Sequence, residues 1–183
     1  MQLIEHQTAQ LARLVEQMTV LLQVDSLHEN LITTSAALNP LLTKLQEDYA
    51  PALAKKGLTL ELQLDDNLPS LNMGHDLSEA LQNVFDNAVT YTSVGGITVS
   101  TVAQDDEIIL TVKDTGSGID PEDLPHLLER FYSVEANKRR KTIAAGLGLI
   151  ITQRIMELSD GRIEIDSQLG VGSTVRLIWP VRG

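Results

Sequence analysis

The chain has 183 residues, of which 43% are hydrophobic, and a formal net charge of −11 at pH 7. This length and hydrophobic content suit a folded domain with its own core and argue against a disordered chain. The acidic balance argues against a nucleic-acid partner, because phosphate contacts need a basic surface, and an aromatic content of 3% is too low for a base-stacking surface. Cysteine is absent, and no apolar run is as long as a membrane span. We therefore expect a soluble, cytoplasmic chain without disulfides and without membrane contact of its own.

The first third of the chain predicts two helices. Residues 3–22 carry apolar side chains at helical spacing, a stripe that needs a partner. A second amphipathic helix is predicted from about His28 to Lys56, with Gly57 as its C-cap, although Pro40 and Pro51 weaken its continuity. Its candidate core residues are Leu31, Ala36, Leu38, Leu41, Leu42, Leu45 and Leu53.

The remainder alternates between strands and helices. Strands are predicted where apolar and polar residues alternate, over residues 58–64, 97–102, 107–112, 163–166 and 174–178, and the last four form two hairpins. Helices are predicted over residues 76–92 and 148–159, with an irregular stretch and one short helix (residues 121–131) between residues 114 and 146. This order favours an α/β (α+β) two-layer sandwich, in which helices cover one face of a mixed, mostly antiparallel sheet and an N-terminal helix is appended.

The helix predicted over residues 76–92 has two distinct faces. Its core face comprises Leu77, Leu81, Val84, Phe85 and Ala88. Asn83, Asn87, Thr90 and Tyr91 share a second face. Two amide oxygens one helical turn apart can hold Mg²⁺, a cation that takes oxygen ligands and is shared with substrate phosphates. A polar face turned to solvent is the alternative interpretation.

Asp114 follows the strand predicted over residues 107–112 and continues its apolar phase, so its carboxylate should point toward the buried face. The run Thr115-Gly116-Ser117-Gly118-Ile119 comes next. A buried carboxylate needs a donor, and the exocyclic amine of adenine is one, while glycines let the backbone approach a ligand. A plain glycine-rich turn is the alternative.

Two further segments suit phosphate. Residues 144–149 open a helix, and unpaired N–H groups at a helix N-terminus favour phosphate. Ile151 stands where the dinucleotide-binding fingerprint has its third glycine, which excludes that fingerprint. The basic run at residues 138–141 lies in the long irregular stretch, which is more typical of a functional lid than of a plain connection. A solvated charged surface is the alternative for this run.

In order and spacing, these segments resemble the histidine-kinase ATPase family, the kinase branch of the Bergerat-type fold shared with gyrase, Hsp90 and MutL. The similarity covers about residues 25–181. Residues 81–92 resemble the asparagine box, 114–119 the first glycine box, 129–132 the phenylalanine box, 146–149 the second glycine box, and 170–174 with Trp179-Pro180 the closing hairpin. The resemblance implies that residues 1–24 are the C-terminal part of a dimerisation and phosphoacceptor helical hairpin. Residues 25–183 would be the ATP-binding domain, with a lid at about 120–146.

The resemblance also implies ATP and Mg²⁺ as cofactors, with Asn83 and Asn87 as metal ligands. Asn83, Lys138 and Arg140 would assist the transfer of the γ-phosphoryl group to a histidine on a dimeric helical hairpin, for relay to a response regulator. The residues implied to bind the nucleotide are Asn83, Asn87, Tyr91, Asp114, Gly116, Gly118, Ile119, Phe131, Gly146, Leu147, Gly148, Leu149 and Thr174.

Several positions depart from the family pattern. Thr90 stands where lysine is frequent and Ser133 where arginine is frequent, while residues 143–145 are Ile-Ala-Ala in place of Gly-Gly-Thr. These changes favour, as an alternative, a degenerate module that binds ATP without phosphotransfer. The surroundings of His6 lack the usual acceptor pattern, so we expect the phosphoacceptor histidine outside this chain.

Two other enzyme classes fit the motifs less well. A self-contained ATPase of the gyrase type needs a glutamate to activate water near the start of the asparagine box, where this chain has Asn83. The run Asp114-Thr115-Gly116-Ser117 also reads like an aspartic-protease signature, but that chemistry needs two carboxylates that share a proton. Only one such motif is present, so a protease would require a dimer.

Overall fold

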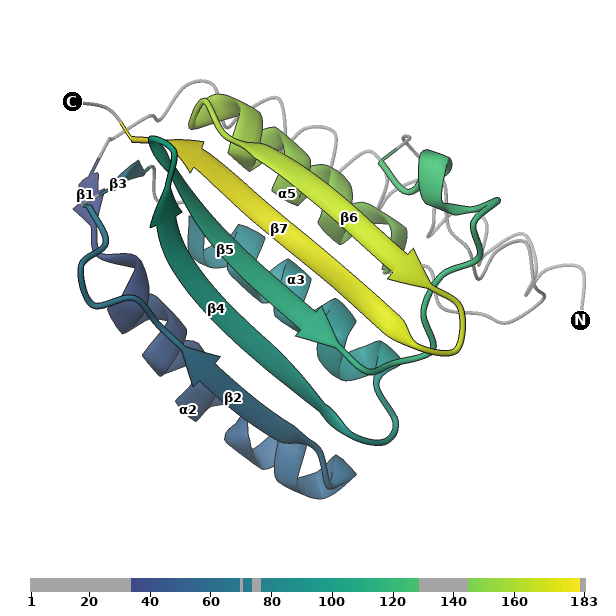
Figure 1. Ribbon diagram of the computed structural model, residues 1–183. Coiled ribbons are helices and arrows are strands. Elements are labelled where there is room, and N and C mark those ends of the chain that lie inside the picture. Colours follow the sequence, from purple (N-terminus) through teal and green to yellow (C-terminus); the bar gives the residue numbers. More distant parts are fainter. Residues whose placement is uncertain (1–33, 70, 74–76, 129–144, 182–183) are drawn as a thin grey trace, which may run out of the picture.

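The computed structural model describes residues 34–69, 71–73, 77–128 and 145–181. Three helices, α2 (Leu38–Lys56), α3 (Leu77–Tyr91) and α5 (Ala145–Leu158), lie against one face of a five-stranded sheet (Figure 1). The sheet order is β2-β4-β5-β7-β6. Its strands are β2 (Thr59–Gln63), β4 (Gly96–Gln104), β5 (Glu107–Asp114), β6 (Arg162–Gln168) and β7 (Gly172–Pro180). A short sheet pairs β1 (Thr34–Ala36) with β3 (Leu71–Met73), and η1 (Leu124–His126) is a single 3-10 turn.

The predicted sandwich is confirmed. The strand β2 runs parallel to β4, whereas every other neighbouring pair in the five-stranded sheet is antiparallel. Both predicted hairpins are present. At the tip of the first, Asp105 and Asp106 have φ of 53° and 61°, the signs that a type I′ turn requires and that match the twist of paired strands. The helix predicted at residues 3–22, the phenylalanine box and the basic run at 138–141 lie outside the described residues.

The second predicted helix is wrong at its start. Residues 34–36, including the supposed core residue Ala36, form β1, and α2 begins only at Leu38. Pro40 lies in the first turn of α2, where a missing N–H is harmless because no intrahelical acceptor exists there. It therefore marks the start of the helix rather than a break, while Pro51 lies inside the helix.

Two smaller elements also differ from the prediction. The strand β3 was not predicted, because three residues are too few to show a period of two. The short helix predicted near residues 121–131 is the 3-10 turn η1 in its described part. In contrast, α3 and its core face are confirmed, since Leu81, Val84 and Phe85 are almost fully buried. They pack in one cluster with core-facing residues of β4, β5 and β7, which fixes α3 against the sheet.

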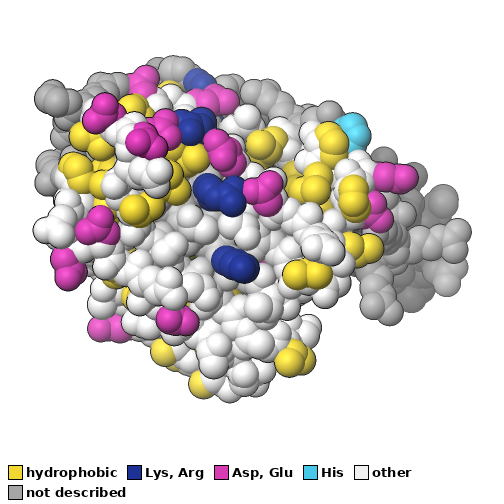
Figure 2. All heavy atoms as spheres, viewed as in Figure 1, with side chains coloured by type: hydrophobic (Ala, Val, Ile, Leu, Met, Phe, Trp, Pro, Cys, Tyr) yellow, Lys and Arg dark blue, Asp and Glu magenta, His cyan; other side chains and the backbone are white. Residues whose placement is uncertain are grey.

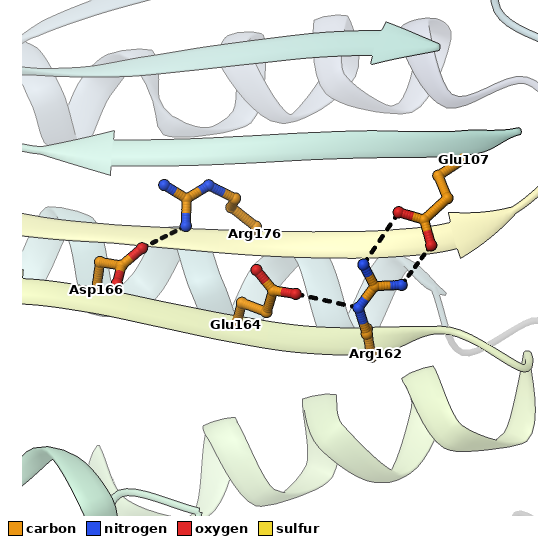
Figure 3. A network of polar contacts seen from close by, with 5 residues as sticks. All are labelled: Glu107, Arg162, Glu164, Asp166 and Arg176. Carbon is orange, nitrogen blue, oxygen red and sulfur yellow. Dashed lines mark hydrogen bonds and ion pairs between the residues drawn. The ribbon is translucent and has the colours of Figure 1, made fainter. Parts of the chain in front are cut away.

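The other face of the sheet is open, and several of its charged side chains pair with one another (Figure 3). Arg162 donates to Glu107 at 2.5 and 3.0 Å across β7, and to Glu164 at 3.0 Å, while Arg176 pairs with Asp166. The Arg162 hydrogen bond lowers the pKa of Glu107. Figure 2 looks onto this face, where basic side chains lie among acidic ones instead of forming a patch of one sign. Exposed pairs of this kind contribute little stability. No helix in the described part of the chain is both long and apolar enough to cross a bilayer.

Candidate functional site

Asp114 closes β5 on the helix-covered side of the sheet and is only 8% exposed, as the alternation of β5 predicted. Its Oδ1 accepts hydrogen bonds from the amides of Gly116 at 2.8 Å and Ser173 at 3.3 Å. Burial raises the pKa of this carboxyl, and the two amide donors partly oppose the shift. Both hydrogen bonds within the described residues go to Oδ1. Oδ2 is therefore the atom available to a ligand.

The glycine-rich turn after Asp114 is held against the end of α3. Ser117 donates its amide to the carbonyl of Tyr91 at 3.1 Å. A Cβ on Gly116 would lie 2.5 Å from that carbonyl oxygen and 2.7 Å from the Asp114 carboxylate, so no larger residue fits there. The first glycine box is therefore shaped by the last residue of α3, in the asparagine box, although the two motifs are more than twenty positions apart.

The β6–β7 hairpin is the third segment around Asp114, beside the end of α3 and the glycine-rich turn. Gly118 has φ of 63°, and a Cβ there would overlap the carbonyl oxygen of Gln168 in this hairpin. Ser167 accepts the Ile119 amide at 2.9 Å and lies 2.9 Å from the hydroxyl of Ser173. Three segments distant in sequence thus meet around Asp114.

The register of β7 places Thr174 differently from the prediction. Thr174 lies opposite Lys113 and Asp166 and is in phase with Arg176, which points to the open face. Ser173 instead shares the phase of the core-facing residues of β7, and its amide reaches Asp114. Ser173 therefore lies beside the Asp114 carboxylate, whereas Thr174, which was predicted to line the nucleotide site, is in phase with the open face. The alternation of β7 carried this signal, because Ser173 continues the phase of its buried residues.

At the opposite end of the site, the first turn of α5 packs against α3 beside Asn83. A Cβ on Gly148 would lie 3.2–3.3 Å from the Asn83 side chain, and Thr152 bridges the Gly148 carbonyl at 2.8 Å and that of Ala80 at 3.4 Å. The Asn83 amide nitrogen is buried and has no hydrogen-bond partner among the described residues. Such a group is rare in native proteins and is usually satisfied by a ligand or water. Asn87 lies one turn further along α3 and is half-buried.

The N-terminus of α5 supplies amides that have no acceptor within the helix. The helix begins at Ala145, so the amides of residues 145–147, which include Gly146 and Leu147, have no acceptor within the helix. Leu149 is the fifth residue of α5, which places its amide in the helical ladder, and its side chain is buried. The amide of Leu149 is thus used within the helix, whereas Gly148 allows α5 to approach Asn83 closely.

These pieces line one face of α3. Asn83 lies near the start of α5, and Tyr91 lies beside the turn that holds Asp114, about 12 Å further along the helix axis at 1.5 Å per residue. A ligand with a base at one end and phosphates at the other suits this span. The described residues contain no cluster of three or more His, Cys, Asp or Glu side chains. A metal here would depend on amide and phosphate oxygens. Phe131, Lys138 and Arg140 lie outside the described residues.

Comparison with known proteins gives the family. Residues 73–183 match the family described as "Histidine kinase-, DNA gyrase B-, and HSP90-like ATPase". The chain belongs to this family. The sensor histidine kinase RppB of Synechocystis is 29% identical over 180 residues, covering 97% of this chain and 40% of RppB. The sensor protein SrrB of Staphylococcus aureus is 40% identical over 105 residues, covering 57% of this chain and 18% of SrrB.

Solved structures in the family share the fold. The crystal structure of full-length ShkA in complex with AMPPNP superposes with a TM-score of 0.76 at 25% identity, covering 91% of this chain and 35% of ShkA. The Acinetobacter baumannii histidine kinase AdeS gives a TM-score of 0.71 at 22% identity, covering 100% of this chain and 84% of AdeS. With 40% of RppB and 18% of SrrB covered, the chain spans less than half the length of these two relatives, which carry further segments.

Proposed function

We propose that this chain is the ATP-binding catalytic domain of a two-component sensor histidine kinase. It would bind ATP and deliver its γ-phosphoryl group to a histidine on a helical hairpin, for relay to a response regulator. The observation that carries the proposal is the buried Asp114 carboxylate, which lies beside the carboxyl-terminal end of α3 and uses Oδ1 for its hydrogen bonds, leaving Oδ2 for a ligand. The first turn of α5 lies beside Asn83, about two helical turns back along α3. The similarity to the sensor histidine kinase RppB and to ShkA, whose structure holds the nucleotide analogue AMPPNP, supports it.

Base recognition would depend on Asp114. An ionised carboxylate only accepts hydrogen bonds, so Oδ2 suits the 6-amino group of adenine. Guanine and hypoxanthine present a carbonyl oxygen at that position. Two acceptors would then face each other, and no hydrogen bond could form between them. Tyr91 and Ser173 would line the same end of the site, and the Gly116–Ile119 turn would lie along the base.

Phosphate binding would occur at the α5 end. The N–H groups of its first turn and the positive end of the helix dipole favour an anion. The oxygen-bearing amides of Asn83 and Asn87 fit Mg²⁺, and the Asn83 nitrogen, which has no partner among the described residues, is a group that a bound nucleotide would satisfy. When bound, Mg²⁺ would neutralise charge on the β- and γ-phosphate oxygens.

Catalysis would then be a matter of positioning. The transferring phosphoryl group passes through a loose transition state, so the residues of the site mainly align it and neutralise its charge. Lys138 and Arg140 would supply the positive charge near the phosphates that lysine and arginine often provide in the family, at the positions where this chain has Thr90 and Ser133. Since Asn83 replaces a water-activating glutamate, we expect very slow hydrolysis without an acceptor histidine.

The whole protein would contain more than this chain. Residues 1–24 would be the C-terminal part of the phosphoacceptor hairpin, through which the protein would dimerise, and residues 25–183 the catalytic domain with its lid at 120–146. We place the domain in the cytoplasm, where a response regulator would receive the phosphoryl group.

A crosswise phosphorylation experiment tests the proposal. The chain is incubated with Mg²⁺ and γ-labelled ATP and with a separately produced helical hairpin that carries the acceptor histidine, and a hairpin lacking that histidine is the control. We expect acid-labile label on the intact hairpin alone. No ATP binding at millimolar nucleotide would reject the proposal. Binding without transfer would favour the degenerate module, which the substitutions at Thr90 and at residues 143–145 already motivate.

A further inference from the structure

The carboxyl-terminal end of α3 has no cation of its own. The last carbonyls of a helix lack intrahelical donors and carry a partial negative charge, which basic residues commonly neutralise. The last turn of α3 contains none. Lys56, the last residue of α2, fills this role from 33 positions away. Its Nζ donates to the carbonyls of Val89 at 2.5 Å, Thr90 at 3.2 Å and Thr92 at 3.5 Å.

The carbonyl between these acceptors has a different partner. Tyr91 accepts from the amide of Ser117, in the turn that follows Asp114. The end of α3 is thus shared between two donors. Lys56 holds the carbonyls on either side of Tyr91, and the turn takes the remaining one. Because Gly116 packs directly on the Tyr91 carbonyl, the position of this oxygen sets the position of the turn.

Lys56 itself is placed firmly. The helix α2 ends at Gly57 in the left-handed conformation (φ 66°), whose amide bonds the Ala54 carbonyl at 3.1 Å, while Leu58 bonds that of Leu53 at 3.0 Å. Leu53, one turn before this end, is buried in the main core. The backbone from which Lys56 extends is therefore fixed by hydrogen bonds and by packing.

A second contact aligns α2 with α3. Tyr49 donates to the Asp86 carboxylate at 2.6 Å, and its ring lies 5.6 Å from that of Phe85, centroid to centroid. Partial burial and the acceptor carboxylate raise the pKa of Tyr49 well above its ordinary value, so the hydroxyl remains a donor at neutral pH. This contact sits on the same two helices as Lys56, which fixes the direction from which its ammonium reaches α3.

We propose that Lys56 is a positioning residue for base recognition. By holding the carbonyls around Tyr91, it sets the Gly116–Ser117 turn and, through the Gly116 amide, the Asp114 carboxylate that reads the base. This inference rests on the proposed function, since it assumes that Asp114 accepts from adenine. It predicts an effect of Lys56 on the choice between bases and not only on stability.

The test compares Lys56→Met, which keeps the length of the side chain without its charge, with Lys56→Arg, which keeps the charge. Lys55→Met is the matched control, because Lys55 is the adjacent exposed lysine on the same helix end. Binding of ATP and of inosine triphosphate, each with Mg²⁺, to the full chain is measured by calorimetry. We expect Lys56→Met to reduce the preference for ATP over inosine triphosphate by roughly threefold to tenfold, the net size of about one hydrogen bond. Lys56→Arg should restore most of it, and Lys55→Met should leave the ratio unchanged.

If Lys56 had a purely structural role, Lys56→Met would weaken the binding of both nucleotides equally. An unchanged ratio in Lys56→Met would therefore overturn the inference, whether or not affinity falls. If Lys56→Met does not fold, as circular dichroism would show, Lys56→Gln takes its place with the same criteria. Failure of the wild-type chain to bind ATP would reject the proposed function itself, which separates the two failures.

Discussion

Replacing Asp114 with asparagine should change which base the site accepts. The asparagine side chain has the same shape, and its oxygen can still accept from the Gly116 and Ser173 amides that bind Oδ1. The NH₂ group then takes the place of Oδ2. A donor would face the 6-amino group of adenine, which is also a donor, in a site that is 8% exposed at this residue.

The size of the effect follows from these contacts. The variant loses a hydrogen bond to a charged group, worth about 1.5–3 kcal/mol, and leaves a buried donor unpaired at a cost of about 1–3 kcal/mol. A combined loss of about 2.5–6 kcal/mol corresponds to roughly seventyfold to more than ten-thousandfold weaker binding of ATP. Inosine triphosphate presents an oxygen at the same position, so its binding should improve relative to the wild-type chain.

The assay is competition calorimetry with ATP and inosine triphosphate against Asp114→Asn. Asp105→Asn is the control, since Asp105 lies in the exposed β4–β5 turn and asparagine tolerates its positive φ. Binding of ATP to Asp114→Asn within about threefold of wild type would refute the role assigned to Oδ2. An inverted preference, with inosine triphosphate bound more tightly than ATP, would establish it.

The same residue gives a pH dependence. Burial raises the pKa of Asp114 above its ordinary value of 3.8, so the fold favours the protonated carboxyl. The stabilising contribution is complete below the ordinary pKa and is lost as pH rises through the raised value. In urea titrations above pH 4, the wild-type chain should therefore lose stability relative to Asp114→Asn as pH rises through the raised pKa, and the difference should level off above it. A difference that runs the other way would contradict burial as the dominant cause.

Three further predictions concern the metal, the core and the turns. Asn87→Ala should remove most of the gain in ATP affinity that Mg²⁺ gives, about tenfold or more, while binding in EDTA stays unchanged; equal loss in both conditions would refute a metal-binding role. Phe85→Ala should lower the free energy of unfolding by about 3–5 kcal/mol in urea titrations, because Phe85 is fully buried, whereas Val94→Ala, at an 81% exposed residue, should change it by less than about 0.5 kcal/mol. Gly118→Ala should destabilise the chain more than Gly170→Ala does, because both glycines have positive φ but only Gly118 packs against a backbone carbonyl. Equal midpoints of urea unfolding for the two variants would show that this close packing is unimportant.

Local pattern was enough for much of the site. The alternation of β5 places Asp114 on the buried face, and the helical spacing of α3 places Asn83, Asn87 and Tyr91 on a face apart from the core. These predictions depend on side-chain directions within a single element, which the backbone geometry dictates. The same alternation in β7 places Ser173, and not Thr174, on the core-facing side, so the phase of that strand was sufficient to predict which of the two lies beside Asp114.

Long-range pairing was decided only by the folded chain. The strands β1 and β3 are three residues each and are strands only because they pair with each other across more than thirty residues. The start of α2 depended on this pairing, which makes Thr34–Ala36 extended, so its sequence alone did not show where the helix begins.

The length and hydrophobic content of the chain determined that it is a folded domain, and its local periodicities predicted a polar face on one helix and a carboxylate at a strand end. The order and spacing of its motifs determined the family. Only the tertiary structure brought the end of α3, the turn after Asp114 and the β6–β7 hairpin into contact. It also placed Lys56 on carbonyls 33 or more positions away. Such contacts leave no period in the sequence, because they are made by packing between elements and not by the geometry of any one of them.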